Sequence, residues 1–516
     1  MKPSRKKTQL ARLDQRYVWH PFTQMQDWLR TNPIVITSGE GAVLRDDCGN
    51  EYLDGNSSIW TNLHGHNHSK INAAISKQLK KIAHSSALGF ANEPASLLAE
   101  KLVELANPKS IVLENKRHSR LGKVFYSDDG STALEVALKL CHEFTRRTGK
   151  SKKPRFLSLD GAYHGDTVGA VSLGHIDLFH KAYSGLLFKT DKVMSPYCYR
   201  CPFNRARPER ADAREYRKCN WECVGKVEQA FDRAKKRKQP FAAFVYEPLM
   251  QGAAGMIPQP QGWLKKVCGL ARAHGAQLIA DEVMTGFGRC SSSGDRNQKP
   301  VIRNQRSIGI PQTQNPRPKT PSARRHPPSP IFASHTEDVQ PDYLCLAKGL
   351  TGGYLPMAAT LTTQAVFDSF LGEYDEFKTF FHGHSYTGNQ LGASAGLANL
   401  TLLESLTSIK GRQRIETALI NALPALWDQP NVGDIRRVGL VVGIELVKNW
   451  QTRQPFDLRE QAGVRVCQAM AKRGVLTRPI GNVIVLMPPY CTAVEQVKQM
   501  IGALYDSIAE VLGGGE

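Results

Sequence analysis

The chain of 516 residues has no run of about 18 consecutive apolar residues, the length that a membrane-spanning helix requires. Its basic N-terminus, residues 1–7, lacks the apolar stretch of a secretory signal. No internal repeat is visible. Hydrophobic residues make up 41% of the chain and aromatic residues 8%, which fits a globular enzyme of two or three domains. Together these features predict a cytoplasmic protein.

The cysteines do not indicate a disulfide framework, because eleven is an odd number and no signal precedes them. Four of them cluster as Cys198-x2-Cys201 and Cys219-x3-Cys223, a spacing compatible with a four-thiolate zinc site. The stretch between the two pairs is charged and poor in apolar residues, so a metal could replace the missing core. No paired histidine strengthens this hypothesis, and the alternative is a surface excursion with free thiols.

Acidic residues are few relative to basic ones, 47 against 68, which gives a net charge of +21. Such an excess makes nucleic acid a candidate partner. One segment, residues 291–336, contains eight Lys or Arg residues and Asp295 alone as an acid, a net charge of +7. It is rich in Pro, Ser and Gln and nearly devoid of the aromatic side chains that stack on bases. We therefore predict a disordered insertion and no nucleic-acid partner.

The order of apolar and polar segments predicts an α/β protein. From about residue 124 to residue 365, short apolar strands alternate with helical stretches, which is typical of a mostly parallel sheet covered by helices on both faces. The expected strands of this sheet are 123–126, 155–159, 243–247, 277–280, 343–346 and 358–361.

Both ends of the chain are expected to contribute to a smaller α+β domain. Near the N-terminus we expect hairpin strands at 39–46 and 50–55 and helices at about 70–82 and 92–105. After about Gly392 we expect one long helix, then strands at 438–446 and 482–487. The predicted division is an N-terminal arm and part of the small domain (1–75), a large domain (76–390), and the long helix with the rest of the small domain (391–516).

Lys348 follows the apolar run 343–346 and precedes a glycine-rich turn. An ammonium group there can be stripped of water, which lowers its pKa and makes the amine a nucleophile toward aldehydes, as in a Schiff-base lysine. Upstream, a second apolar run ends in the carboxylate of Asp281. Pyridoxal 5'-phosphate (PLP) needs this pair, because its ring nitrogen stays protonated beside a carboxylate. The alternative is that Asp281 begins a turn and Lys348 is a solvated surface residue.

Two further segments offer contacts for the same cofactor. Gly130 and Ser131 lie between a strand and a helix, where backbone N–H groups and the helix dipole bind phosphate; the same pair is also an ordinary N-cap. Tyr163 follows the next strand and could stack on the cofactor ring, or could be a core tyrosine. His382 and His384 suggest a metal only weakly, because no third ligand is nearby.

Several motifs carry a resemblance to a known family, which spans about residues 16–511. Taken together, the segments above resemble the class III aminotransferases of PLP fold type I, and within that class the biotin-pathway enzymes that convert 8-amino-7-oxononanoate to 7,8-diaminononanoate. The finer match is carried by Trp19-His20-Pro21-Phe22-Thr23-Gln24-Met25, Ser57-Ser58-Ile59-Trp60-Thr61-Asn62-Leu63-His64-Gly65-His66, Tyr163-His164-Gly165-Asp166-Thr167, Gly286-Phe287-Gly288-Arg289 and Leu476-Thr477-Arg478-Pro479.

The resemblance implies a role for each matching residue. Lys348 would be the Schiff-base lysine and Asp281 the partner of the ring nitrogen. The remaining cofactor-binding residues would be Gly130, Ser131, Tyr163, His384 and Ser385. The substrate-binding residues would be Phe22, Trp60, Tyr163, Lys348, Gly383 and Arg478.

Three further features follow from the resemblance. His384 and Ser385 match a segment that reaches the phosphate in the neighbouring subunit, which implies a homodimer with shared sites. Arg478 would hold the carboxylate of the keto acid by a bidentate fork. Glu247 and Gln251 fall in a segment near the cofactor.

The amino donor and the insertion set this chain apart within the family. Members use either S-adenosylmethionine or lysine as donor, and the Ser-Ser-Ile-Trp form looks somewhat closer to the lysine-using branch, so the donor stays open. The alternative activity is that of another ω-amino acid transaminase, acting on ornithine or 4-aminobutyrate; residues 19–25 argue against it.

Asp281 and Lys348 lie 67 positions apart, whereas the family usually has roughly thirty, so an extra surface loop is expected.

Overall fold

The computed structural model describes residues 7–108, 120–291 and 331–513. The predicted disordered insertion therefore lies largely outside the described residues. Its last part does not: Phe332, Ala333 and Ser334 are fully buried. The prediction was wrong for residues 331–336, because they pack into the core and, from Ala333 on, form the short 3-10 helix η3 (Ala333–Glu337).

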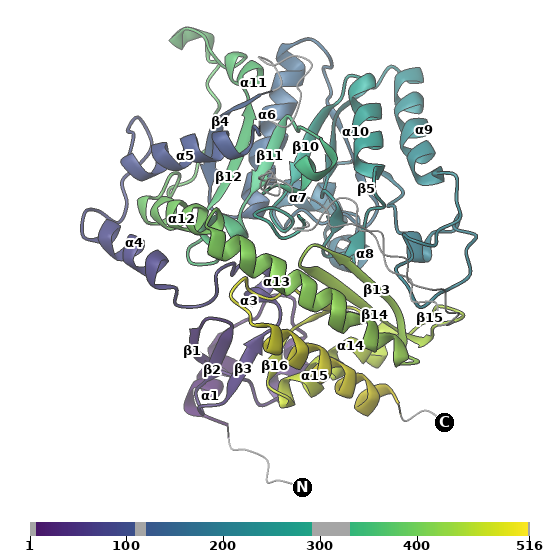
Figure 1. Cartoon of the computed structure of the whole chain (residues 1–516). Coiled ribbons are helices and arrows are strands. Elements are labelled where there is room, and N and C mark those ends of the chain that lie inside the picture. Colours follow the sequence, from purple (N-terminus) through teal and green to yellow (C-terminus); the bar gives the residue numbers. More distant parts are fainter. Residues whose placement is uncertain (1–6, 109–119, 292–330, 514–516) are drawn as a thin grey trace, which may run out of the picture.

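The largest element is a seven-stranded sheet in the order β4-β12-β11-β10-β7-β5-β6 (Figure 1). Its neighbours are parallel except at β12, which runs antiparallel to β11 and β4. The six predicted strands are all present, and β6 is an additional one. Their bounds are β4 (Leu121–Ser127), β5 (Arg155–Leu159), β6 (Asp191–Val193), β7 (Phe241–Tyr246), β10 (Gln277–Asp281), β11 (Tyr343–Leu346) and β12 (Ala358–Thr363).

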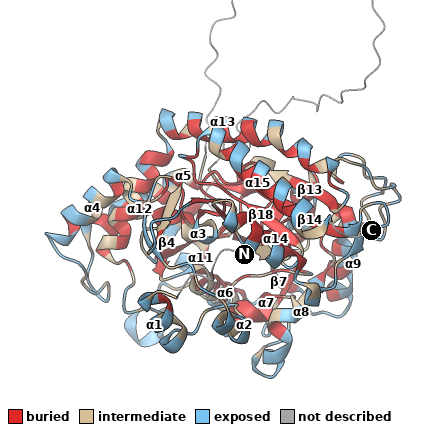
Figure 2. Cartoon of the chain, turned by 90° about the horizontal axis from the view of Figure 1, so that it is seen from below, coloured by how far each residue is buried: buried red, intermediate tan, exposed pale blue. Residues whose placement is uncertain are grey.

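Alternate residues of the central strands belong to opposite faces of this sheet, as the two-residue period of a strand requires. Ile279 and Tyr343 pack in one apolar cluster with Leu134 of helix α6 (Gly130–Arg147). Leu278 and Leu344 belong to the other cluster, which continues into the rest of the molecule. Both faces are therefore covered, and the buried residues run through the strands and the inner sides of the helices (Figure 2).

The two ends of the chain meet in a four-stranded sheet, where β16 (Val475–Leu476) lies parallel to β3 (Glu51–Asp54). The strand expected at 39–46 is in fact two, β1 (Ile36–Glu40) and β2 (Val43–Asp46), because Gly41 has a φ of 55° and turns the chain between them. This shared sheet supports the division that we propose, with residues 1–75 and 391–516 forming a small domain.

The C-terminal part differs from expectation at two turns. The predicted long helix is two helices, α12 (Gln390–Leu403) and α13 (Leu406–Ala422), because the Oγ of Ser405 caps a new helix by accepting from Ser408 N at 3.2 Å. The strand predicted at 438–446 begins later than expected, at Val441. A turn at Gly439 separates it from the preceding strand β13, which ends at Val438. The strands here are β13 (Val432–Val438), β14 (Val441–Asn449), β15 (Gln454–Pro455), β17 (Pro479–Ile480) and β18 (Val483–Leu486).

The two helices expected near residues 70–82 and 92–105 are confirmed as α4 and α5. No helix in the described part of the chain has the length and apolar character needed to cross a membrane. The remaining elements are α1 (Gln9–Tyr17), α2 (Met25–Arg30), α4 (Ser69–Leu79), α5 (Glu93–Leu105), α7 (Val168–Leu173), α8 (Asp177–His180), η1 (Lys181–Leu186), η2 (Cys198–Arg200), β8 (Met250–Gln251), β9 (Ile257–Pro258), α9 (Glu222–Lys236), α10 (Trp263–Ala273), η4 (Lys348–Thr351), α11 (Gln364–Asp368), η5 (Tyr374–Glu376), η6 (Leu423–Asp428), η7 (Leu458–Glu460), α14 (Ala462–Lys472) and α15 (Val494–Leu512).

One turn has an unfavourable backbone conformation. The four residues of α3 (Ser57–Trp60) have φ values of 47°, 48°, 63° and 69°, so they form a single left-handed helical turn without glycine. This conformation costs roughly 1–2 kcal/mol for each residue with a side chain. The surrounding contacts must therefore favour it strongly, and such strain is found most often at functional sites.

Candidate active site

A cavity of about 750 Å³ opens at the carboxyl ends of five strands that run in the same direction. Because these ends meet at one edge of the sheet, short loops far apart in sequence line a single space. The lining residues that end or follow these strands include Asp128 after β4, Tyr163 after β5, Glu247 after β7, Asp281 at the end of β10 and Lys348 after β11.

Lys348 follows β11 with a φ of 44°, so the chain turns sharply where the side chain enters the cavity. Burial lowers the pKa of the Lys348 amine below its ordinary value, although the charges of Asp281 and Glu247 act in the opposite direction. The Nζ atom lies 4.9 Å from the centre of the Trp60 ring. The site therefore favours a neutral, nucleophilic amine more than open solvent does.

Asp281 is buried and makes two hydrogen bonds through its carboxylate. Its Oδ2 lies 2.8 Å from His164 Nδ1, and its Oδ1 accepts from Val283 N at 3.1 Å. Burial alone would lower the pKa of His164, but the hydrogen bond and charge of Asp281 raise the His164 pKa overall. His164 thus orients Asp281, a contact that sequence reasoning missed because 117 positions separate the two residues.

Glu247 is a second buried carboxylate on the cavity wall. Its Oε2 accepts from Gly252 N at 2.7 Å and its Oε1 from Tyr163 N at 3.4 Å. Burial above all raises the pKa of Glu247 to about 7, and the charge of Asp281 adds to this effect. Glu247 therefore holds the backbone around Tyr163 and can change its charge near neutral pH.

The N-terminus of α6 forms the corner predicted to bind phosphate. Asp129 caps the helix by accepting from Thr132 N at 2.9 Å, and Ser131 Oγ donates to Asp129 Oδ1 at 2.7 Å. The corner is crowded: a Cβ atom on Gly130 would lie 2.7 Å from Val283 Cγ1, and one on Gly165 would lie 2.2 Å from Ser131 Cβ. Larger residues would close this end of the cavity, so the two glycines keep the helix terminus accessible.

Phe22 and Arg478 line a second cavity of about 490 Å³. Arg478 Nη2 donates to the Phe22 carbonyl at 3.2 Å, and much of the remaining wall is apolar. The Phe22 ring contacts the Tyr163 ring edge-on, with 6.4 Å between centres. Because Tyr163 lines the first cavity and Phe22 the second, these rings lie between the two spaces.

Three predicted site residues lie outside both cavities. His384 Nδ1 is 3.0 Å from Asp128 Oδ2, so it sits next to the rim of the first cavity. The Ser385 carbonyl lies 2.9 Å from His84 Nε2, and Gly383 is exposed. The chain therefore does not bring Gly383, His384 and Ser385 into its own pocket.

The expected zinc site is not supported. Cys198, Cys201, Cys219 and Cys223 do line one small cavity of about 10 Å³. Among the described residues, however, no three of their sulfur atoms lie within 4.8 Å of one another.

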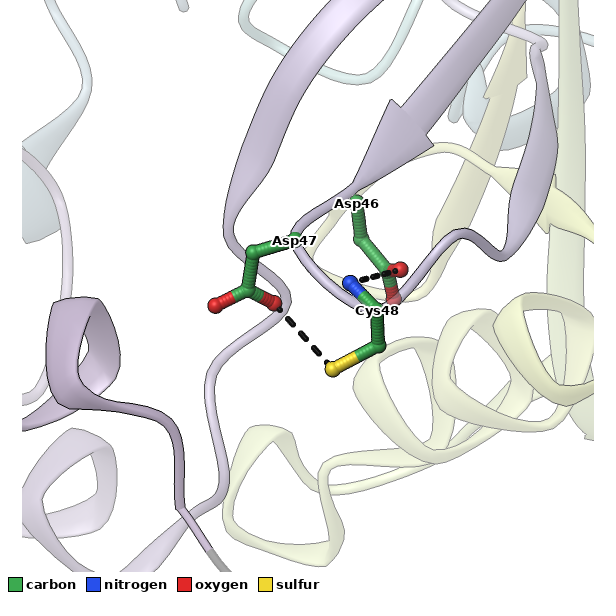
Figure 3. Close-up of side chains that lie close together, drawn as sticks. All are labelled: Asp46, Asp47 and Cys48. Atoms are coloured by element: carbon green, nitrogen blue, oxygen red, sulfur yellow. Dashed lines mark hydrogen bonds between the residues drawn. The ribbon is translucent and has the colours of Figure 1, made fainter.

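The group that does meet this distance limit is Asp46, Asp47 and Cys48, three consecutive residues of the turn between β2 and β3 (Figure 3). Asp46 Oδ1 accepts from the backbone N of Cys48 and of Asn50, both at 2.9 Å, so this carboxylate closes the turn.

The first cavity suits PLP on three chemical grounds. It offers an amine with a lowered pKa, a buried carboxylate held by a histidine, and a helix N-terminus open to an anion. The fold and the site together define a PLP-dependent enzyme of fold type I.

Comparison with known proteins identifies the family. The family model for class-III aminotransferases matches residues 25–293 and 330–508. The chain belongs to the class III aminotransferases, and it is a transaminase.

Individual relatives match over nearly the whole chain. It is 42% identical over 501 residues to the adenosylmethionine-8-amino-7-oxononanoate aminotransferase of Geobacter sulfurreducens, with 97% of each protein covered. The crystal structure of the same-named enzyme from Methanocaldococcus jannaschii has a TM-score of 0.80 at 36% identity, covering 97% of this chain and 99% of that one. A PLP-bound amine transaminase from an uncultivated Pseudomonas species has a TM-score of 0.79 at 29% identity, covering 96% and 99%.

The family match also bears on the insertion, because it leaves out residues 294–329. The described residues on either side lie close together: Gly288 N donates to the Ile331 carbonyl at 2.9 Å. The matched residues before and after this segment are therefore neighbours in the fold.

We expect little effect from deleting residues 293–329 and joining the ends with a short Gly/Ser bridge, since loop length has a weak effect on stability. The melting temperature should change by less than about 2 °C and the transamination rate by less than about twofold. Differential scanning calorimetry and a steady-state assay measure both. Phe332→Ala, which empties a core position beside the same loop, is the control and should cost about 3–5 kcal/mol. A deleted protein that folds but has lost turnover would show that the segment works in catalysis.

Proposed function

We propose that this transaminase transfers the amino group of S-adenosylmethionine to 8-amino-7-oxononanoate and so forms 7,8-diaminononanoate, a step of biotin biosynthesis. The near full-length similarity to relatives named for this reaction carries the proposal. Those names also favour S-adenosylmethionine over lysine as donor, against the weak indication from residues 57–60.

The cavity residues have complementary roles in this proposal. When bound, PLP supplies a carbonyl for the donor amine and a ring that delocalises the electron pair left on the donor carbon. Lys348 would hold the cofactor, and its released Nζ would then carry the proton between carbon atoms as a general base. Asp281, oriented by His164, would keep the proton on the ring nitrogen. Gly130 and Ser131 would bind the phosphate at the start of α6.

The second cavity fits the acceptor. 8-Amino-7-oxononanoate has a long apolar chain that ends in a carboxylate, and this cavity combines a mostly apolar wall with the guanidinium of Arg478. Phe22 and Tyr163 lie between the two cavities, so the acceptor would pass these two rings to bring its keto group to Lys348. Trp60 lines the other side of the first cavity, where it would contact substrate.

Replacing Arg478 by Gln should lower kcat/KM for the keto acid by about 10–100-fold, because a charge-assisted hydrogen bond contributes about 1.5–3 kcal/mol. The methyl ester of the keto acid, which has no carboxylate, should lose less than about threefold. Arg473→Gln is the matched control, since Arg473 pairs with Glu510 at 2.7 Å and lines neither cavity. Equal losses of kcat/KM for the acid and for its ester would show that Arg478 does not bind the carboxylate.

The alternative is an ω-amino acid transaminase acting on ornithine or 4-aminobutyrate. The same assays decide between the two: turnover with these donors but none with S-adenosylmethionine and the keto acid would select the alternative. Lys348→Ala should be inactive with every donor, because the residue that holds the cofactor would be gone.

We also propose that the enzyme is a cytoplasmic homodimer in which Gly383, His384 and Ser385 complete the pocket of the partner subunit. Around this segment, large apolar side chains are exposed, namely Leu88, Phe90, Phe381 and Tyr386 at 62–88%. A second subunit that covered them would bury this apolar surface. All eleven cysteines are free, as expected for a reducing compartment.

Shared sites predict complementation between two inactive variants, Lys348→Ala and Ser385→Trp. A mixed dimer would then have one pocket with both changes and one with neither, so random mixing should restore roughly a quarter of wild-type activity in a symmetric dimer. Co-expression with two different tags, followed by activity measurement, tests this. If each pocket were built from one chain, the mixture would remain inactive.

A further inference from the structure

The left-handed turn Ser57–Trp60 lies directly against the reactive lysine. Two backbone hydrogen bonds close it with the same spacing as in an α-helix, although the turn itself is left-handed. Trp60 N donates to the Asn56 carbonyl and Thr61 N to the Ser57 carbonyl, both at 2.9 Å. Serine, isoleucine and tryptophan all disfavour positive φ, so the sequence alone would not form this turn. Contacts from outside the turn must select it.

Trp60 is the residue that the turn presents to the cavity. Its ring centre lies 4.9 Å from Lys348 Nζ, and it lines the same cavity as Asp281. Gly252 packs beside the ring, since a Cβ atom there would lie in ordinary contact with Trp60 Cζ3, at 3.5 Å. Within the described residues the buried Trp60 Nε1 has no hydrogen-bond partner, so packing and backbone conformation position the ring.

A single buried carboxylate, that of Asp54, accepts hydrogen bonds from several groups of the turn. Its Oδ1 accepts from Asn56 N at 3.2 Å and from Ser58 N at 3.0 Å. Its Oδ2 accepts from Ser58 Oγ and lies near His66 Nε2, both at 2.9 Å. Burial alone would raise the pKa of Asp54, but the bonds from His66 and Ser58 lower it overall. Asp54 is thus a charged acceptor for two successive parts of the turn.

The position of Asp54 connects this clamp to the fold. It is the last residue of β3, whose neighbour β16 leads directly to Arg478 in the second cavity. Ser57 Oγ donates to the Met487 carbonyl at 2.6 Å and pins the turn to the C-terminal part of the chain. The sheet shared by both chain ends therefore fixes Asp54, and Asp54 fixes the turn.

We propose that Asp54 is a positioning residue for transamination: it holds the left-handed turn that keeps the Trp60 ring over the Lys348 amine and so shapes the donor side of the cavity. Asp54 touches neither substrate nor cofactor in this proposal and acts through Trp60. The inference rests on the proposed role of Lys348 as the cofactor-binding lysine.

Asp46 provides a matched control within the same sheet. It is a buried aspartate at the end of the neighbouring strand β2, and it closes a turn by accepting from Cys48 N (Figure 3). It also accepts from Asn50 N and Tyr52 OH. That turn does not line the active-site cavity. Asp46→Asn and Asp54→Asn therefore each replace a buried carboxylate that holds a turn, but only the turn held by Asp54 reaches the active-site cavity, through Trp60.

The test is a double-mutant cycle between Asp54 and Trp60 in the PLP-loaded enzyme. Asp54→Asn should lower kcat/KM for the amino donor by about tenfold, mainly by raising KM, whereas Asp46→Asn should change it by less than about twofold. In a Trp60→Ala background, Asp54→Asn should have less than about twofold further effect, because its target is gone. An undiminished effect in that background, or equal effects of Asp46→Asn and Asp54→Asn, would overturn the proposal.

A milder variant covers the case in which Asp54→Asn fails to fold. Ser58→Ala removes only the hydroxyl that donates to Asp54 Oδ2 and should raise KM for the donor about two- to threefold, an effect that also disappears with Trp60→Ala. An unchanged KM in Ser58→Ala would contradict the proposal. If the wild-type protein transaminates no donor at all, the proposed function fails instead, so the two failures are distinguishable.

Discussion

The rest of the structure depends on one interaction, that of the desolvated Lys348 amine with two buried carboxylates, Asp281 and Glu247. Desolvation favours the neutral amine, and the carboxylates limit how far its pKa falls. That balance requires a cavity whose charged groups come from different strands. A parallel sheet meets the requirement, because the carboxyl ends of β7, β10 and β11 bring the three groups together without a long loop.

The remainder of the molecule maintains that cavity from two sides. His164 orients Asp281 from the loop after β5, so the geometry of one carboxylate depends on two strands, β5 and β10, that lie on either side of β7. On the opposite side, the strained turn at Ser57–Trp60 covers the amine with an aromatic ring. The sheet formed jointly by β3 and β16 holds both that turn and Arg478. This shared sheet therefore supports one part of the cavity wall and also positions the cation proposed for the acceptor.

The sequence predicts the sheet and the lysine–aspartate pair because each depends on a local pattern, an apolar run followed by one polar residue. It does not predict the contact of His164 with Asp281, which only the fold brings together. The turn at Trp60 goes against local preference, since tertiary contacts select it. Ser405 and Gly41 break predicted elements for a related reason: a single capping or turn residue interrupts a pattern that otherwise continues.

The central claim is that Lys348 is the lysine that holds the cofactor. Reducing the purified, PLP-loaded protein with borohydride would fix a pyridoxyl group on that lysine, and peptide mass spectrometry would then locate it. A single modified peptide is expected, with the pyridoxyl group on Lys348, two residues after the end of β11. A pyridoxyl group on another lysine, with Lys348 unmodified, would contradict it.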